Sequence, residues 1–137
     1  MLAQTLVTIS AAIMTVLGLM HLAYTYFSDK LHPRDTDLLA QLKTTSLVIS
    51  RQTNMWKAWI GFNASHSLGA ILFGAVFGYL AIQQPTLLFN SHFLGFTGLI
   101  VLGAYLAMAR LYWFTRPLQG IALAFMFYVT GFILANI

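Results

Sequence analysis

A histidine, His66, lies inside a long apolar stretch of the chain, with Asn63 and Ser67 beside it. The stretch is apolar enough to cross a bilayer as a helix, and an ionisable side chain within such a segment is costly and usually functional. A neutral imidazole bonded to a backbone carbonyl is the alternative, structural role. His66 therefore marks a position for chemistry and does not by itself specify a reaction.

A second histidine, His21, is expected at a similar depth on the preceding apolar segment. His21 is about two helical turns from the end of its segment, and His66 is two to three turns from the start of its own. Arg110, about one turn from the inner end of a third segment, can join them or can extend to the lipid headgroups. We predict a polar pocket near the cytoplasmic side of a membrane. Its ligand-binding residues are expected to be His21, Tyr24, Trp59, Asn63, His66, Ser67 and Arg110.

Three kinds of function are consistent with the sequence, and two of them use this pocket. Tyr24, Trp59 and Phe62 provide aromatic walls for a lipid-soluble ligand such as a quinone, an isoprenoid or a phospholipid head. Alternatively, His21 and His66 ligate the iron of haem b from both sides, and these residues are metal ligands only in that case. Catalysis would need an acid or base, for which only the two histidines qualify, and binding without turnover is the expectation.

The third kind of function is a non-catalytic accessory or assembly subunit of a larger membrane complex. Almost no mass lies outside the apolar segments, and the last two segments are rich in aromatic side chains that face either lipid or a partner. These side chains are Phe125, Phe127, Tyr128 and Phe132. Possible partners are therefore the lipid bilayer, further copies of the chain, or a larger complex.

Composition excludes several other classes. Of the 137 residues, 59% are hydrophobic and 7% charged, which is far from the mixture of a soluble domain. The only acids are Asp29, Asp35 and Asp37, and cysteine is absent, so carboxylate-pair, thiol and cysteine-metal chemistry in the membrane are excluded. The net charge of +4 is explained by membrane topology, and we expect no nucleic-acid partner.

Apolar runs of membrane-spanning length occur four times, so the fold class is an all-α integral membrane protein. We expect an antiparallel four-helix transmembrane bundle that forms a single domain over residues 1–137. The expected spans are about 4–27, 56–82, 92–115 and 118–136. A tight Arg116-Pro117 corner is expected between the last two. In the long polar connection, Asp35, Thr36 and Asp37 offer N-cap chemistry for a short cytoplasmic interfacial helix.

Lysine and arginine fix the orientation of these spans. All seven lie in or beside the first and third connections, and none lies near either terminus. Because basic loops stay in the cytoplasm, both termini are expected outside, in the periplasm if the membrane is a bacterial inner membrane.

Helical projection groups the polar and small residues on shared faces. On the first segment the face contains Ser10, Met14, Gly18, His21 and Thr25. On the second, Ala70, Gly74 and Gly78 continue the face of His66 with the small-residue spacing that allows close helix approach. We interpret that spacing as packing within the chain, with a dimer face as the alternative.

The residues of three short stretches suggest a family. Met55 to Gly69, MWKAWIGFNASHSLG, together with Gly18-Leu19-Met20-His21 and Tyr112-Trp113-Phe114, resembles a group of small bacterial four-span proteins. The general layout is similar to that of the DoxX-like membrane proteins. The resemblance implies a four-helix bundle, a bacterial origin and, through the link of DoxX-like proteins to redox complexes, an accessory role. It implies no activity.

Overall fold

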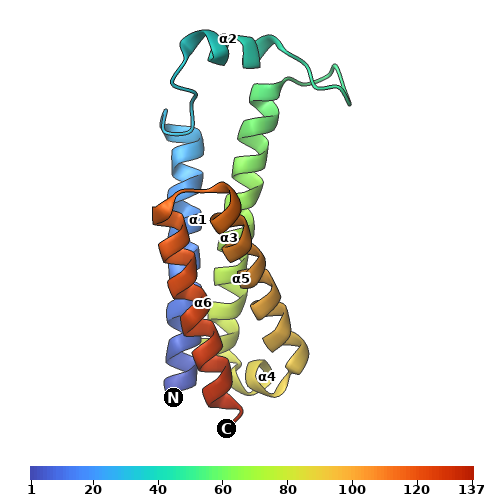
Figure 1. Cartoon of the computed structure of the whole chain (residues 1–137). Coiled ribbons are helices and arrows are strands. Elements are labelled where there is room, and N and C mark those ends of the chain that lie inside the picture. The colour runs from blue at the N-terminus through green and yellow to red at the C-terminus, as the bar shows by residue number, and fades with distance from the viewer. The chain divides into compact units, whose positions relative to one another are not determined.

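A computed structural model describes all 137 residues, and its secondary structure is helical without β-strands (Figure 1). The helices are α1 (Leu2–Phe27), α2 (Thr36–Thr44), α3 (Met55–Gln83), α4 (Pro85–Asn90), α5 (His92–Tyr112) and α6 (Thr115–Ala135).

Four of these helices, α1, α3, α5 and α6, are long and apolar enough to cross a membrane. The most apolar 18-residue stretches of α1, α3, α5 and α6 have mean hydropathies of 2.0, 1.6, 1.7 and 1.9. The shortest of these helices, α5 and α6, each have 21 residues. At 1.5 Å per residue, 21 residues measure about 30 Å, the thickness of a bilayer's hydrocarbon layer. The four apolar helices expected from the sequence are therefore confirmed, with ends within three residues of the expected ones.

The connections differ from expectation in two places. The short connection after α3 contains a further helix, α4, whose first residue is Pro85, and proline is well suited to this position because its fixed φ is helical. The expected corner at Arg116-Pro117 is wrong, because the turn falls at Trp113 and Phe114 and α6 begins at Thr115. Pro117 is tolerated in the first helical turn, where a backbone N–H has no partner within the helix.

The expected helix in the long connection is present as α2. The Asp35 side chain caps it, since its Oδ1 accepts hydrogen bonds from the backbone N–H groups of Asp37 at 2.8 Å and Leu38 at 3.2 Å. This cap explains why the helix begins at Thr36.

The chain divides into two compact units. One contains residues 1–17 and 70–137, and the other contains residues 18–69. Helices α1 and α3 each contribute residues to both units. The single domain expected over the whole chain stays a prediction.

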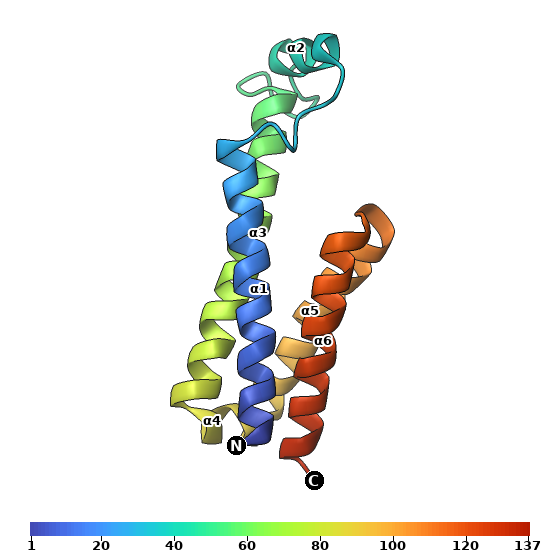
Figure 2. The same cartoon turned by 90° about the vertical axis from the view of Figure 1, so that its left-hand side faces the viewer.

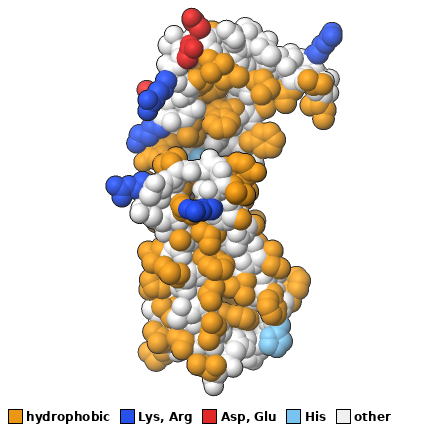
Figure 3. Space-filling model, viewed as in Figure 1, with side chains coloured by type: hydrophobic (Ala, Val, Ile, Leu, Met, Phe, Trp, Pro, Cys, Tyr) orange, Lys and Arg blue, Asp and Glu red, His pale blue; other side chains and the backbone are white.

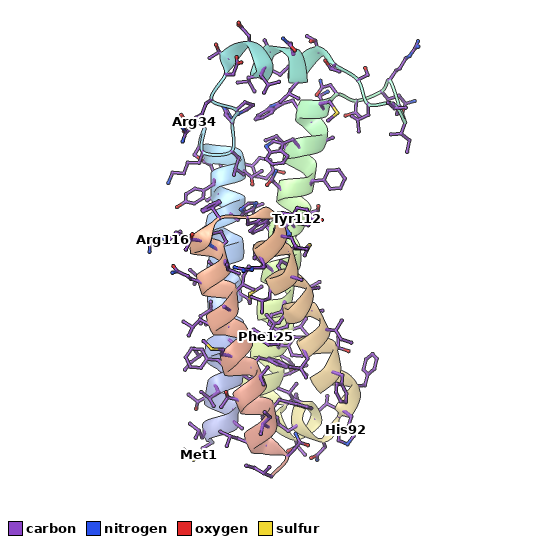
Figure 4. All side chains as sticks on the ribbon, viewed as in Figure 1. Met1, Arg34, His92, Tyr112, Arg116 and Phe125 are labelled. Atoms are coloured by element: carbon purple, nitrogen blue, oxygen red, sulfur yellow. The ribbon has the colours of Figure 1, made fainter.

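An aromatic cluster forms the core of the unit of residues 1–17 and 70–137. Phe73 and Phe77 stack at 4.6 Å between ring centroids, and the Tyr128 ring meets Phe77 edge-on at 5.6 Å. The expectation that Tyr128 faces lipid or a partner is wrong, since it is 1% exposed and packs in this core. Phe125, labelled in Figure 4, also packs against the core and is only partly exposed.

Small residues allow α1 and α3 to approach closely in this unit. A Cβ added at Gly74 would overlap the Thr15 hydroxyl and lie 2.6 Å from the Ala11 carbonyl oxygen, and one at Gly78 would touch the Ala11 side chain at 3.5 Å. Elsewhere on α1, the buried Ser10 hydroxyl donates to the Ala124 carbonyl of α6 at 2.7 Å. The interpretation of this spacing as packing within the chain is confirmed.

The ends of this unit differ in chemistry. Both termini and α4 lie at one end, and the α5–α6 turn lies at the other (Figures 1 and 2). Figure 4 shows Tyr112 and Arg116 beside that turn and His92 at the opposite end of α5. Hydrophobic side chains cover most of the visible face of α5 and α6 between the two ends (Figure 3). The surface therefore has an apolar band with basic residues toward one end.

Candidate functional site

His21 of α1 and Asn63 of α3 are joined by a side-chain hydrogen bond in the unit of residues 18–69. The distance from His21 Nε2 to Asn63 Oδ1 is 3.0 Å. Both side chains are half-buried, and each lies on a helix with the length and composition of a membrane span. Two of the residues expected in a polar pocket are thus in direct contact.

The partners of Asn63 define how the His21 ring is oriented. The Asn63 amide nitrogen donates to the Trp59 carbonyl oxygen at 2.8 Å, which fixes the amide nitrogen on that side. Its Oδ1 is then the atom that faces His21, and since a carbonyl oxygen only accepts, His21 Nε2 must carry the hydrogen. In its neutral form the His21 ring therefore has Nδ1 as its acceptor.

His66 lies one helical turn beyond Asn63 and contacts the same histidine. The centroids of the His21 and His66 rings are 5.6 Å apart, and the ring planes meet at 72°, an edge-to-face arrangement. The expectation that imidazoles from α1 and α3 lie at one level is confirmed by this contact.

Two buried hydroxyls next to the histidines bond to their own helices. Ser67, fully buried, donates to the Asn63 carbonyl at 2.8 Å, and Thr25 donates to the His21 carbonyl at 2.8 Å. Such bonds to the preceding turn satisfy a hydroxyl hydrogen where water is absent. Ser67 thus lies in the cluster, as expected, but only its oxygen lone pairs can serve a ligand.

Trp59 connects this cluster to the polypeptide that follows α1. Its indole N–H donates to the Leu31 carbonyl oxygen at 3.0 Å, while its own carbonyl accepts from Asn63. Hydrogen bonds therefore join His21 to Asn63, Asn63 to the Trp59 backbone, and the Trp59 side chain to Leu31. The role of Leu31 was not predicted, because a backbone carbonyl leaves no signal in the sequence.

A cavity of about 310 Å³ adjoins Trp59. It is lined by Leu31, His32, Pro33, Leu42, Trp56 and Trp59. On its wall the His32 and Trp56 rings meet edge-to-face, with centroids 4.9 Å apart and planes at 87°. His32 was not among the residues expected in the site, because its contact with Trp56 depends on the path of the connection after α1.

The remaining aromatic residues expected in the site are more peripheral. Tyr24 is half-buried, and the Lys30 ammonium lies 4.1 Å from the centroid of its ring, in the geometry of a cation–π contact. Phe62 is 72% exposed and Trp59 is 46% exposed. Both side chains are therefore at least partly on the surface of α3.

Arg110 lies in the other compact unit, in the last turn of α5, and is exposed. The convergence of Arg110 with the two histidines therefore stays a prediction. The site that the structure describes consists of His21, Asn63, His66 and Ser67, with Trp59 and its cavity on the adjoining turn of α3; we refer to it as the His21–Asn63 site.

The side chains of this site do not match the ligand sets of haem or of a metal ion. No group of three or more His, Cys, Asp or Glu side chains is positioned to hold a metal ion. Two imidazoles that share a haem lie on opposite faces of the porphyrin, with the iron between their nitrogens. Here the rings touch each other edge-to-face, and His21 Nε2 faces Asn63. The geometry of the two rings does not fit a haem between them.

Comparison with known proteins adds no further assignment. The chain matches no protein-family model, no curated protein and no solved structure. The resemblance to DoxX-like proteins accordingly stays a prediction.

Proposed function

We propose that this chain is an integral membrane protein that binds a lipid-soluble ligand at the His21–Asn63 site. The four apolar helices would insert as an antiparallel bundle, with both termini outside and the site toward the cytoplasmic leaflet. The hydrogen bond between His21 and Asn63, with the His66 ring in contact, is the observation that carries the proposal.

The case for the membrane rests on exposed apolar surface. In the apolar windows of the four long helices only 22–39% of residues are buried inside the structure. Water would not tolerate such extensive apolar exposure on a monomer, whereas lipid acyl chains would.

The case for a ligand rests on the cost of polar groups at this position. Two imidazoles and an amide are expensive in apolar segments, and a bundle that needed only packing could use apolar residues instead. The amide and imidazoles supply neutral donors and acceptors, and no carboxylate belongs to the cluster or to the lining of the adjoining cavity. These neutral donors and acceptors suit a carbonyl or hydroxyl oxygen of a ligand better than they suit a cation.

The case for a lipid-soluble ligand rests on the surroundings. Trp59 accepts a hydrogen bond from Asn63 through its backbone carbonyl and also lines a cavity of about 310 Å³, a volume at the lower end of the range for small-molecule sites. Phe62 presents an aromatic surface on the same helix. A quinone ring with its apolar tail in the bilayer combines the carbonyl oxygens and the aromatic faces that these residues would recognise.

Titration of the purified protein in nanodiscs with decylubiquinone, followed by quenching of tryptophan fluorescence, tests this proposal. We expect saturable quenching that weakens about 10-fold or more in His66→Phe, since loss of one or two polar contacts costs about 1.4 kcal/mol or more. Ser65→Ala is the matched control, because Ser65 is exposed on α3 and its hydroxyl bonds only to the Phe62 carbonyl. Equal quenching in all three proteins, or none that saturates, would count against the site. An optical spectrum after haem supplementation, in which we expect no Soret band, separates a quinone from a haem.

The accessory-subunit alternative draws on a separate observation. One face of α5 exposes Phe93, Phe96, Ile100 and Leu111, which are 56–77% exposed. Their spacing is that of a helix-packing stripe, although lipid alone can also cover it. Blue-native electrophoresis of native membranes distinguishes the two, because only a partner would shift the chain to a larger species.

A further inference from the structure

The loop between α2 and α3 is closed by hydrogen bonds at its base. Ser46 and Asn54 form an isolated antiparallel bridge, and the Met55 N–H donates to the Thr45 carbonyl at 2.9 Å. The Asn54 amide nitrogen also donates to the Lys43 carbonyl at 2.8 Å. Residues 46–54 therefore form a defined loop that leaves α2 and returns to the first turn of α3 (Figure 1).

Two aliphatic side chains at the tip of this loop have no contact that buries them. Val48 is 109% exposed and Ile49 is 89% exposed, the highest values among large hydrophobic residues away from the termini. Single exposed apolar residues are common, but two adjacent β-branched ones on a loop with a fixed base form an apolar tip. An apolar partner outside the chain would bury this tip.

Charge identifies the kind of partner. Lys43, Arg51 and Lys57 surround the tip in sequence, and no acidic residue follows Asp37 anywhere in the chain. Hydrophobic and basic side chains lie together at the far end of the loop in Figure 3. An apolar tip among basic residues is complementary to a lipid surface with anionic headgroups.

We infer that Val48 and Ile49 insert into the headgroup and upper acyl region of an anionic leaflet, while Arg51 contacts lipid phosphate. The inference rests on the membrane insertion proposed above, because α3 begins at Met55, directly after the loop, and would bring the loop to the bilayer surface. A lipid surface is favoured over a protein partner because the loop is fixed to the start of a helix of membrane-spanning length and composition. The loop would thereby fix the level at which α3 enters the bilayer and, with it, the level of Trp59.

Site-directed spin labelling tests this inference cleanly because the chain contains no cysteine. Single variants Val48→Cys and Ile49→Cys would carry a nitroxide in the full-length protein, held in nanodiscs of phosphatidylcholine alone or mixed with phosphatidylglycerol. Gln52→Cys is the control in the same loop, since Gln52 is exposed and polar. Collisions with oxygen and with a nickel chelate report lipid and water respectively.

We expect the ratio of oxygen to nickel collisions to be several-fold higher at positions 48 and 49 than at position 52. The ratio should rise further in discs with phosphatidylglycerol, and Arg51→Gln should remove that rise. Water-like values at positions 48 and 49 would overturn the inference, and a ratio that is the same in both lipids would overturn the assignment of an anionic partner.

A fourth label separates this inference from the proposal on which it rests. Leu72, in the middle of α3, is 64% exposed, so a nitroxide from Leu72→Cys should contact acyl chains if α3 spans the bilayer. A water-exposed label at position 72 would contradict the membrane proposal itself. A lipid-exposed label at position 72 with water-exposed labels at 48 and 49 would overturn only the role of the loop.

Discussion

The imidazole Nε2 of His21 lies 3.0 Å from Oδ1 of Asn63, a residue 42 positions later in the chain. The bond joins α1 to α3 at a level where both helices are otherwise mostly apolar. In such surroundings each polar group depends on the other, because an unpaired amide or imidazole would lose its hydration without compensation. The site is therefore both a helix-helix contact and a set of polar atoms that a ligand can use.

Replacing Asn63 should change the hydrogen position on His21. In the wild-type protein at alkaline pH, ¹⁵N NMR of the imidazole should show the Nε2–H tautomer, because Asn63 Oδ1 can only accept. Asn63→Leu removes that acceptor, so the signal of the Nδ1–H tautomer should grow. A wild-type His21 that carries its hydrogen on Nδ1 would refute the assigned hydrogen-bond direction.

The same variant should lower stability modestly. Asn63→Leu removes the side-chain bonds to His21 and to the Trp59 carbonyl, and such bonds in membrane proteins contribute about 0.6 kcal/mol each on average. We expect a loss of about 1 kcal/mol in unfolding by denaturing detergent, with Ser65→Ala unchanged. A variant as stable as the wild type would show that the bond serves binding only.

Packing of α1 on α3 should be sensitive to one methyl group at Gly74. A Cβ there would overlap the Thr15 hydroxyl and approach the Ala11 carbonyl, so Gly74→Ala should cost about 1–3 kcal/mol in the same unfolding assay. Gly61→Ala is the matched control on α3, because nothing lies within 4 Å of its added Cβ. The control should be neutral or slightly stabilising, as alanine favours helices. Similar effects at the two glycines would argue against the close contact.

The ring of Tyr128 should contribute more to the stability of the protein than its hydroxyl does. Its O–H lies 3.3 Å from the Gly95 carbonyl, a long bond, whereas its ring is 1% exposed and packs on Phe73 and Phe77. Tyr128→Phe should cost less than about 1 kcal/mol and Tyr128→Ala about 3–5 kcal/mol. If the two variants lost similar amounts of stability in detergent unfolding, the hydrogen bond and not the ring packing would be the main contribution of Tyr128.

Cysteine labelling in intact cells should reveal the orientation. With both termini outside, a membrane-impermeant maleimide should label Gln84→Cys, which lies between α3 and α4, and should leave Ser50→Cys unlabelled until the cells are opened. The expectation follows from the basic residues, all of which lie in or beside the first and third connections. The reverse pattern would place the His21–Asn63 site toward the other leaflet.

The helices could be predicted from the sequence because hydropathy and length alone identify them. The buried face of α1 was also predictable, since the periodicity places Ser10 and Met14 together and both are at most 1% exposed. The contact between the two histidines was predictable as well. Counting helical turns from the connection between the two segments places His21 and His66 at one level.

Other contacts of the site and the core could not be predicted, because they depend on the path of the chain and hydrophobic periodicity does not reveal that path. The bond from Trp59 to the Leu31 carbonyl and the contact of His32 with Trp56 need the exact course of the connection after α1. Tyr128 was misjudged because an aromatic residue in an apolar helix can face either lipid or the core. Its burial follows from Gly98 on α5, where an added Cβ would overlap the Tyr128 ring.

Native mass spectrometry of the protein, gently extracted from its own membrane, tests the central claim most directly. We expect the wild type and Ser65→Ala to retain an additional lipid-soluble mass that His66→Phe and Asn63→Leu lose. Absence of any retained species in the wild type, or equal retention in all four proteins, would contradict ligand binding at the His21–Asn63 site.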